Sequence, residues 1–199
     1  IEIDSISGRI AQKLYPEADI AINGFEKIKL AKGSFDLAVG NVPFGNHGVN
    51  DKTKAYSGML IDDYFFAKSL DSVRSGGVVA FITSTGTLDK EDIKVRQMLA
   101  QKAELMGAVR LPNNAFQKNA GTQTSTDIIF LKKREKPLNI SDMPMDKSCD
   151  WVHTKENADG LKINSYFADN PDMVLGNLSD NGRFGSIVCT PIQGADLKE

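Results

Sequence analysis

Cysteine and histidine are scarce in this chain of 199 residues, and each shortage excludes a class of site. Cys149 and Cys189 are the only cysteines, too few for a disulfide framework or a four-cysteine metal site. His47 and His153 lie in loops without a second ligand at metal spacing, so we predict no metal site. No apolar run approaches the roughly 18 residues that a membrane span needs, and no signal-segment pattern is seen. We therefore expect a protein of a reducing, cytoplasmic compartment with no membrane partner.

Neither sign of charge is in excess. The chain has 24 Lys and Arg against 26 Asp and Glu, a net charge of -2, which excludes a simple polycationic nucleic-acid binder. Apolar residues make up 41% and charged residues 25%, the composition of an ordinary globular domain. The first residue, Ile1, is not Met and lies in a strand-like run, so we expect a fragment of a longer protein.

Short strand-like runs alternate with helical patterns over residues 1–135, whereas Asp, Asn, Gly and Ser dominate the rest. This alternation predicts an α/β fold with a mostly parallel sheet. We expect residues 136–199 to form an extended arm or linker without a core of its own. The predicted helices are Ser5–Leu14, Asp62–Val73 (capped by Asp62 or Asp63) and Glu91–Glu104, and the predicted strands are Ala18–Asn23, Phe35–Val39, Val78–Thr83, Leu105–Arg110 and Thr126–Leu131.

The segment with the most chemical content is the turn Asn-Val-Pro-Phe-Gly after the strand Phe35–Val39. In an open α/β sheet, ligands gather at the carboxyl ends of the strands. Pro43 forces Val42 into extended geometry, which leaves the Val42 carbonyl free to accept a hydrogen bond. Asn41 adds a side-chain acceptor and Phe44 a flat ring, a set that suits a planar group with an amino substituent, such as adenine. The alternative is an ordinary strand-ending turn, because Asn and Gly are turn residues and Phe usually packs in a core.

The run Asn41-Val42-Pro43-Phe44 resembles the (D/N/S)PP(Y/F) motif of amino-methyltransferases, especially DNA adenine-N6 methyltransferases. The resemblance covers about residues 1–134. It is strongest to the methylase portion of very large methyltransferase–helicase-like proteins of bacteria and mobile elements, which carry similar ELDSxxGRIA, GNVPFG, DYFFAKSLD and RLPNNAF stretches. It implies a Rossmann-like sheet, methylation of N6 of an adenine flipped out of DNA, and these four residues as the catalytic turn. The rest of a longer, helicase-like parent chain is the further implied partner.

The same resemblance implies S-adenosylmethionine as the cofactor. Glu2 resembles the acidic end of the family's second strand, which holds the ribose hydroxyls. Glu26 resembles the acidic residue that bonds the adenine amino group of the cofactor, with Phe25 or Ile28 packing on that ring, and Asn41 also lies against the cofactor. Without the resemblance, Glu2 reads as an exposed charge at a strand end and Glu26 as part of an ordinary turn.

Two departures from the family's pattern affect the interpretation. The second motif position is Val42 instead of proline, which is tolerable because the carbonyl makes the hydrogen bond. The family's first strand and glycine-rich cofactor loop precede the Glu2 strand, and neither is found in this sequence. Further along, Phe116 resembles an aromatic residue that packs, together with Phe44, on the flipped base.

We therefore predict an N-terminally truncated methyltransferase sheet: a partial catalytic domain over residues 1–135, followed by the arm. Such a fragment is expected to be inactive alone and prone to self-association through unpaired strand edges. Two alternatives remain open: a protein glutamine-amide methyltransferase, which uses a similar turn, and a non-catalytic module that binds DNA or a helicase-like domain.

Overall fold

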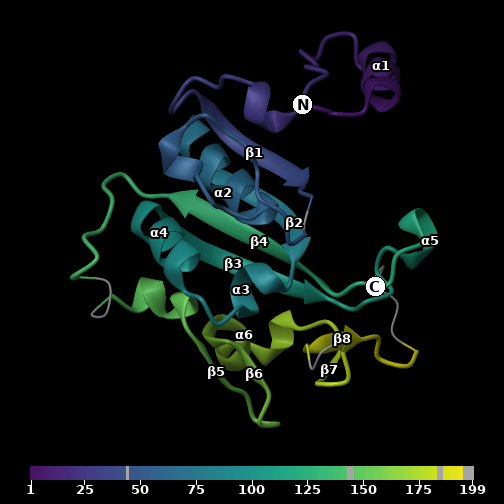
Figure 1. The fold of residues 1–199 in the computed structure, drawn as a ribbon. Coiled ribbons are helices and arrows are strands. Elements are labelled where there is room, and N and C mark those ends of the chain that lie inside the picture. The colour runs from purple at the N-terminus through teal and green to yellow at the C-terminus, as the bar shows by residue number, and fades with distance from the viewer. Residues whose placement is uncertain (44, 143–145, 183–185, 195–199) are drawn as a thin grey trace.

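A four-stranded sheet forms the centre of the computed structural model, which describes residues 1–43, 45–142, 146–182 and 186–194 (Figure 1). The strand order is β1-β2-β4-β3. The strands are β1 (Phe35–Asn41), β2 (Val73–Ser84), β3 (Ala103–Leu111) and β4 (Thr126–Lys133). The helices of this part are α1 (Ser5–Leu14), η1 (Phe25–Lys27), η2 (Lys54–Tyr56), α2 (Ile61–Ser72), α3 (Gly86–Asp89), α4 (Lys94–Lys102) and α5 (Gln117–Ala120).

The sheet is mixed. Strands β1, β2 and β3 run in one direction, as expected of a mostly parallel sheet, whereas β4 runs antiparallel to its two neighbours, β2 and β3. A parallel return needs a crossover of a dozen or more residues, usually with a helix that packs on the sheet. The link between β3 and β4 contains only the four residues of α5 as helix. The chain therefore turns back beside β3, and β4 is inserted between β2 and β3.

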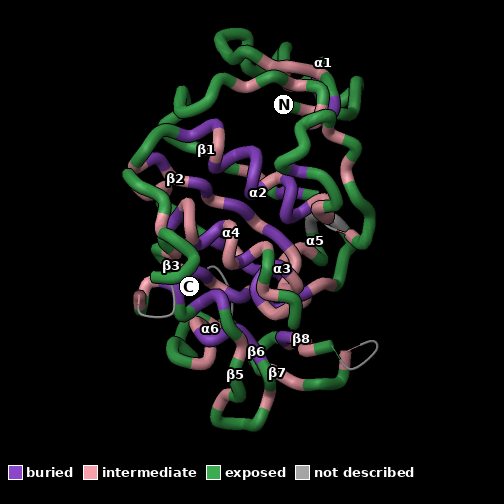
Figure 2. The backbone as a smooth tube through the Cα atoms, turned by 60° about the vertical axis from the view of Figure 1, so that its left-hand side comes forward, coloured by how far each residue is buried: buried purple, intermediate pink, exposed green. Residues whose placement is uncertain are grey.

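Buried side chains alternate along β2 and cluster with those of α2 and α4. Val79 and Phe81 pack with Phe66, Leu70 and Leu99 in the main hydrophobic core. The rings of Phe66 and Phe81 meet edge to face, with centroids 5.1 Å apart. This alternation is typical of a sheet with one covered face, and it explains why α2 is almost entirely buried (Figure 2).

The other face of the sheet is open. Strand register places Val39, Ala80 and Phe130 in one row across β1, β2 and β4. Val39 is 72% exposed, and Leu37 of the same strand is also exposed. Apolar side chains that stay exposed to water on an edge strand contribute little to the stability of the fold. This face is therefore an exposed apolar surface at an unpaired strand edge.

Helix α1 forms as predicted but packs little of its apolar face. Asp4 is its N-cap, with the carboxylate accepting a hydrogen bond from the Ser7 amide at 2.7 Å. Gly8 is buried because the helix approaches Ile22 there so closely that a Cβ atom would lie 2.7 Å from the Ile22 side chain. The rest of the helix is largely exposed at the upper end of the molecule (Figure 2). The predicted strand Ala18–Asn23 is reduced to one parallel bridge between Glu2 and Ile22.

The N-terminus of α2 departs from its predicted cap. Leu60 is the N-cap residue, and no side chain of the described residues caps the helix. Asp62 instead accepts a hydrogen bond from Thr87, and Asp63 pairs with Lys90. These two acids lie in the first turn, where the helix dipole still favours them.

Residues 146–179 pack along the β3 side of the sheet. Cys149, Trp151, Ile163 and Phe167 belong to the same core as the sheet, and the Asn164 amide donates to the carbonyls of Leu88 and Trp151. The region expected to be an extended arm thus contributes to the central core. Its elements are η4 (Lys147–Val152), β5 (Thr154–Glu156), β6 (Lys162–Asn164), α6 (Ser165–Asp169), η5 (Pro171–Met173) and β7 (Asn177–Ser179), with β8 (Val188–Thr190) pairing later with β7. Within the described ranges, no helix has the length and apolar character needed to cross a membrane.

Candidate functional site

The turn Asn41–Pro43 leaves the sheet at the carboxyl end of β1. The Val42 amide donates to the Ile82 carbonyl at 3.1 Å, which continues the ladder with β2 by one bond. The Val42 side chain is only 3% exposed and belongs to the core. A proline has no N–H for this bond, so valine anchors the turn by a contact that the family's usual residue cannot make.

Two acceptors of this turn are available. Asn41 and Pro43 are exposed. Among the described residues, none donates a hydrogen bond to the Asn41 side chain or to the Val42 carbonyl. The prediction for Phe44 lies outside the described residues. The described part of the turn thus offers the pair of acceptors expected for an amino group.

A cavity of about 1890 Å³ lies between the N-terminal segment and β1. It is larger than the roughly 300–1000 Å³ of an ordinary ligand pocket, and its lining includes the exposed apolar side chains of β1. The cavity brings together six of the predicted site residues, which are Glu2, Phe25, Glu26, Asn41, Val42 and Pro43.

Glu2 is held at this cavity by its backbone. Its amide donates to the Ala21 carbonyl at 3.0 Å, and its carbonyl accepts from the Asn23 amide at 2.9 Å. One carboxylate oxygen, Oε1, accepts from the Asp4 amide at 2.8 Å. In the described chain the second oxygen has no such donor, so it is available to a ligand hydroxyl.

The Glu26 carboxylate folds back over Gly24 in this turn. A Cβ atom on Gly24 would lie 2.4 Å from both carboxylate oxygens, so a side chain there would require the Glu26 side chain to move. The Phe25 ring packs against Phe65 of α2, with centroids 4.6 Å apart. Ile28, the other residue expected near the cofactor ring, also lines the cavity.

Three residues that sequence reasoning missed lie beside this turn: Asp51, Tyr64 and Lys68. The Tyr64 hydroxyl donates to Asp51 at 2.7 Å, and the Lys68 ammonium forms an ion pair with Asp51 at 3.2 Å. Burial alone would raise the pKa of Asp51, but the hydrogen bonds from Tyr64, Thr53 and Lys68 outweigh it and hold the pKa far below its usual range. Burial and the Asp51 charge raise the pKa of Tyr64, so the phenol stays protonated.

Part of this network carried a weak signal in the sequence. Tyr64 and Lys68 stand four residues apart in the predicted helix, and therefore on one face. Their partner Asp51 lies in a loop, and nothing in a loop sequence indicates which helix it faces.

Phe116 lies outside the cavity. It is the N-cap residue of α5, which projects beyond the ends of β3 and β4 (Figure 1). Arg110, two residues before Pro112, is fully buried and pairs with Asp127 through two hydrogen bonds of 2.8 and 2.9 Å. This pair fixes the strand ends from which the segment carrying Phe116 departs.

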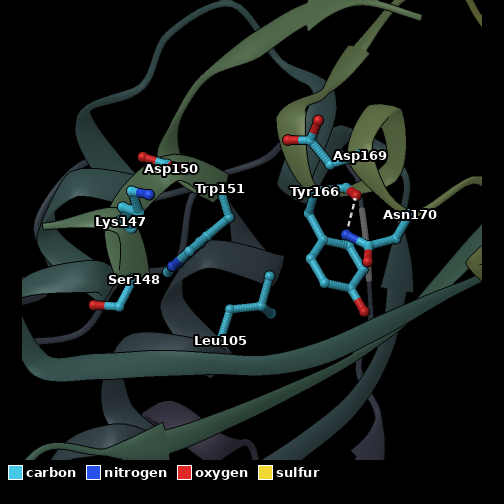
Figure 3. A pocket seen from close by; sticks show the side chains of 8 residues that line it. All are labelled: Leu105, Lys147, Ser148, Asp150, Trp151, Tyr166, Asp169 and Asn170. Carbon is cyan, nitrogen blue, oxygen red and sulfur yellow. Dashed lines mark hydrogen bonds between the residues drawn. The ribbon is translucent and has the colours of Figure 1, made fainter.

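A second, smaller pocket of about 220 Å³ contains none of the predicted residues. It lies beside β3, with Leu105 between Trp151 and Tyr166 (Figure 3). The Trp151 indole nitrogen is buried and has no hydrogen-bond partner in the described part of the chain. Over the same residues, no three His, Cys, Asp or Glu side chains lie close enough together to hold a metal ion.

Comparison with known proteins gives one family and one curated relative. The profile of the N-6 DNA Methylase family matches residues 15–162, a span that starts after Glu2 and includes part of the region that packs beside β3. The Defense against restriction protein B of Escherichia phage P1 is 37% identical over 137 residues, which are 66% of this chain and 6% of that protein. The chain therefore spans only a small part of this relative.

Two solved structures share the fold. A Listeria monocytogenes protein described as a class I S-adenosylmethionine-dependent methyltransferase matches with a TM-score of 0.55 and 14% identity, over 75% of this chain and 54% of that one. The M protein of the type I restriction enzyme EcoKI matches with a TM-score of 0.51 and 20% identity, over 66% of this chain and 30% of that one. At these identities the likeness establishes the fold, an α/β methyltransferase sheet.

Proposed function

Because the chain belongs to the N-6 DNA methylase family, we propose that it supplies the catalytic turn and part of the cofactor site for methylation of adenine N6 in DNA. The observation that carries this proposal is the cavity at the end of β1. It combines free acceptors at Asn41 and Val42 with two acidic residues, Glu2 and Glu26, and an aromatic ring at Phe25.

The turn acts on the target base through positioning. Hydrogen bonds from the adenine amino group to Asn41 and to the Val42 carbonyl orient the nitrogen and direct its lone pair toward the methyl donor. Placing reactants in this way removes a large part of an activation barrier without a covalent nucleophile. Pro43 restricts the backbone of Val42 to extended geometry, which limits the orientations of the Val42 carbonyl. Phe44 and Phe116 remain proposed contacts of the flipped base.

The cavity residues fit S-adenosylmethionine. The free oxygen of Glu2 can accept from ribose hydroxyls, Glu26 can accept from an adenine amino group, and Phe25 offers a ring to stack on. When bound, this cofactor supplies an electrophilic methyl group on a sulfonium.

We further propose that the open face and free edge of β1 are covered in the full-length protein. Phe35, Leu37 and Val39 are 42%, 54% and 72% exposed, and all three line the cavity. Residues 1–135 are then part of a catalytic domain, and residues 146–179 support its sheet from the β3 side. The match to the N-6 DNA Methylase family supports DNA as the substrate.

The test incubates the full-length protein with DNA and labelled S-adenosylmethionine and identifies the methylated nucleoside by mass spectrometry. We expect N6-methyladenine. A labelled protein with unmodified DNA would favour glutamine methylation, and cofactor-independent DNA binding without any methylation would favour a non-catalytic module. Residues 1–199 alone, assayed in parallel, should show no turnover, because β1 is then uncovered.

A further inference from the structure

Lys68 is a buried cation at the wall of the cavity. The residue is 8% exposed and lies in α2, with its ammonium 4.9 Å from the centre of the Phe25 ring and 5.4 Å from that of Tyr64. Lysine is almost never buried this far unless its charge is paired. Here the charge is balanced by Asp51, whose side chain is also only 6% exposed.

All three donors of the ammonium are in use. Lys68 Nζ donates to the Phe25 carbonyl at 2.6 Å, to the Tyr64 hydroxyl at 2.9 Å and to Asp51 at 3.2 Å. An ammonium group has three N–H donors and no acceptor. Lys68 therefore has no donor left for a ligand, and any effect on binding must pass through its partners.

The three partners come from different parts of the chain. Phe25 belongs to the turn that places Glu26, Asp51 to the loop that follows the Asn41–Pro43 turn, and Tyr64 to α2 itself. The bond to the Phe25 carbonyl is charge-assisted and short, which makes it one of the stronger bonds that fix this turn. Among the described residues, this turn also has hydrogen bonds from the Lys27 amide to the Gly24 carbonyl at 2.9 Å, from the Ile28 amide to the Phe25 carbonyl at 3.3 Å and from the Gly24 amide to Asn23 Oδ1 at 3.0 Å.

We propose that Lys68 is a positioning residue for the cofactor, which holds the turn of Phe25 and Glu26 in the conformation that receives the adenine ring and its amino group. This inference rests on the proposed function. Lys68 fastens the cofactor turn to the buried helix α2, and through Asp51 it fastens the loop after the catalytic turn to the same point. Loss of the ammonium leaves the Phe25 carbonyl without this hydrogen bond, so the turn that orients Glu26 is no longer fixed to α2.

The test compares Lys68→Met with Lys102→Met in the full-length protein. Lys102 is a matched control, since it also forms a partly buried ion pair, with Asp71 at 2.8 Å, but contacts no predicted site residue. We expect Lys68→Met to raise the dissociation constant for S-adenosylmethionine about tenfold, with kcat at saturating cofactor within about twofold. Lys102→Met should leave the dissociation constant unchanged while lowering the melting temperature. Equal cofactor affinity in wild type and Lys68→Met, or an equal loss in both variants, would overturn the proposal.

Two further measurements keep the proposal testable. If Lys68→Met does not fold, Lys68→Gln removes the charge and at least one of the three bonds, and its cofactor affinity must fall by about threefold or more. If the wild-type protein binds no cofactor, the proposed function fails, but hydrogen exchange in residues 1–199 still decides on the positioning role. The Lys27 and Ile28 amides must exchange faster in the Lys68 variant than in Lys102→Met, and equal rates would refute it.

Discussion

Arg110→Met should be among the most damaging single substitutions in the chain. Arg110 and Asp127 are 1% and 0% exposed, and the guanidinium also bonds Asp89 at 2.7 Å and lies 4.4 Å from the centre of the Phe167 ring. Burial alone would lower the pKa of Arg110 and raise that of Asp127, and the mutual attraction of the pair opposes both changes. The two parallel hydrogen bonds are those of a charged guanidinium and a charged carboxylate.

The methionine variant leaves the Asp127 carboxylate buried without its partner. Breaking a buried pair in this way costs about 3–5 kcal/mol, a large part of the roughly 5–15 kcal/mol that stabilises a typical domain. The free energy of unfolding is measured by urea denaturation of the 199-residue chain at pH 7, followed by circular dichroism. Arg74→Met serves as the control, because the Arg74–Asp36 pair is exposed and contributes little.

The double variant Arg110→Met/Asp127→Leu separates loss of the pair from loss of packing. Replacing a buried ion pair by apolar residues of similar volume is often nearly neutral. We therefore expect the double variant to recover most of the stability lost in Arg110→Met. A single variant that loses less than about 1 kcal/mol, or a double variant that is no better than the single one, would refute the reasoning.

Three further predictions concern the site. In the full-length protein, Asn41→Ala should slow DNA methylation by about a hundredfold or more, since it removes an acceptor that stabilises developing charge; a wild-type rate with an intact circular dichroism spectrum would exclude Asn41 from catalysis. Glu2→Gln should raise the dissociation constant for S-adenosylmethionine more than about tenfold and leave DNA affinity unchanged. Equal cofactor affinities of variant and wild type, measured by calorimetry, would show that Glu2 is only a surface charge. Because the folded pKa of Asp51 lies below its ordinary value of 3.8, its contribution to stability is complete above that value and is lost as the pH falls below it. Asp51→Asn should therefore flatten the fall of the melting temperature below pH 4, and parallel curves for variant and wild type would contradict the assignment.

The predicted elements that succeeded are those with a local cause. Helix Ser5–Leu14 begins after a capping aspartate and ends before a proline, and the structure has the same bounds. Strand β1 and the turn after it follow from an apolar run that stops at Asn and Pro. The resemblance assigned Glu2, Glu26 and Asn41 to one site, because its order of motifs places strand ends at a common edge. In the structure all three residues line one cavity.

What could not be predicted depends on contacts between distant residues. The direction of β4 is decided by how the chain returns after β3, and periodicity does not encode strand direction. Lys68 meets Phe25 across 43 positions, and Arg110 meets Asp127 across 17. From the sequence alone, Lys68 and Arg110 are predicted to lie on the surface, because lysine and arginine are rarely buried without a paired acid. Their acidic partners become neighbours only in the folded chain. The region after Pro137 read as an arm because its apolar residues are scattered, although several of them enter the core of the sheet.

The two halves of the proposed site are anchored unequally. The Asn41–Pro43 turn is joined to the buried side of the sheet through the Val42 amide and the Val42 side chain. Glu2, in contrast, is held by a single bridge to Ile22, beside a helix whose apolar face is exposed. Local stability follows buried contacts, so the turn should keep its geometry when the open face of β1 is uncovered, whereas the position of Glu2 should not. If a further part of the protein covers β1, as we propose, we expect its removal to change the position of Glu2 before it changes the Asn41–Pro43 turn.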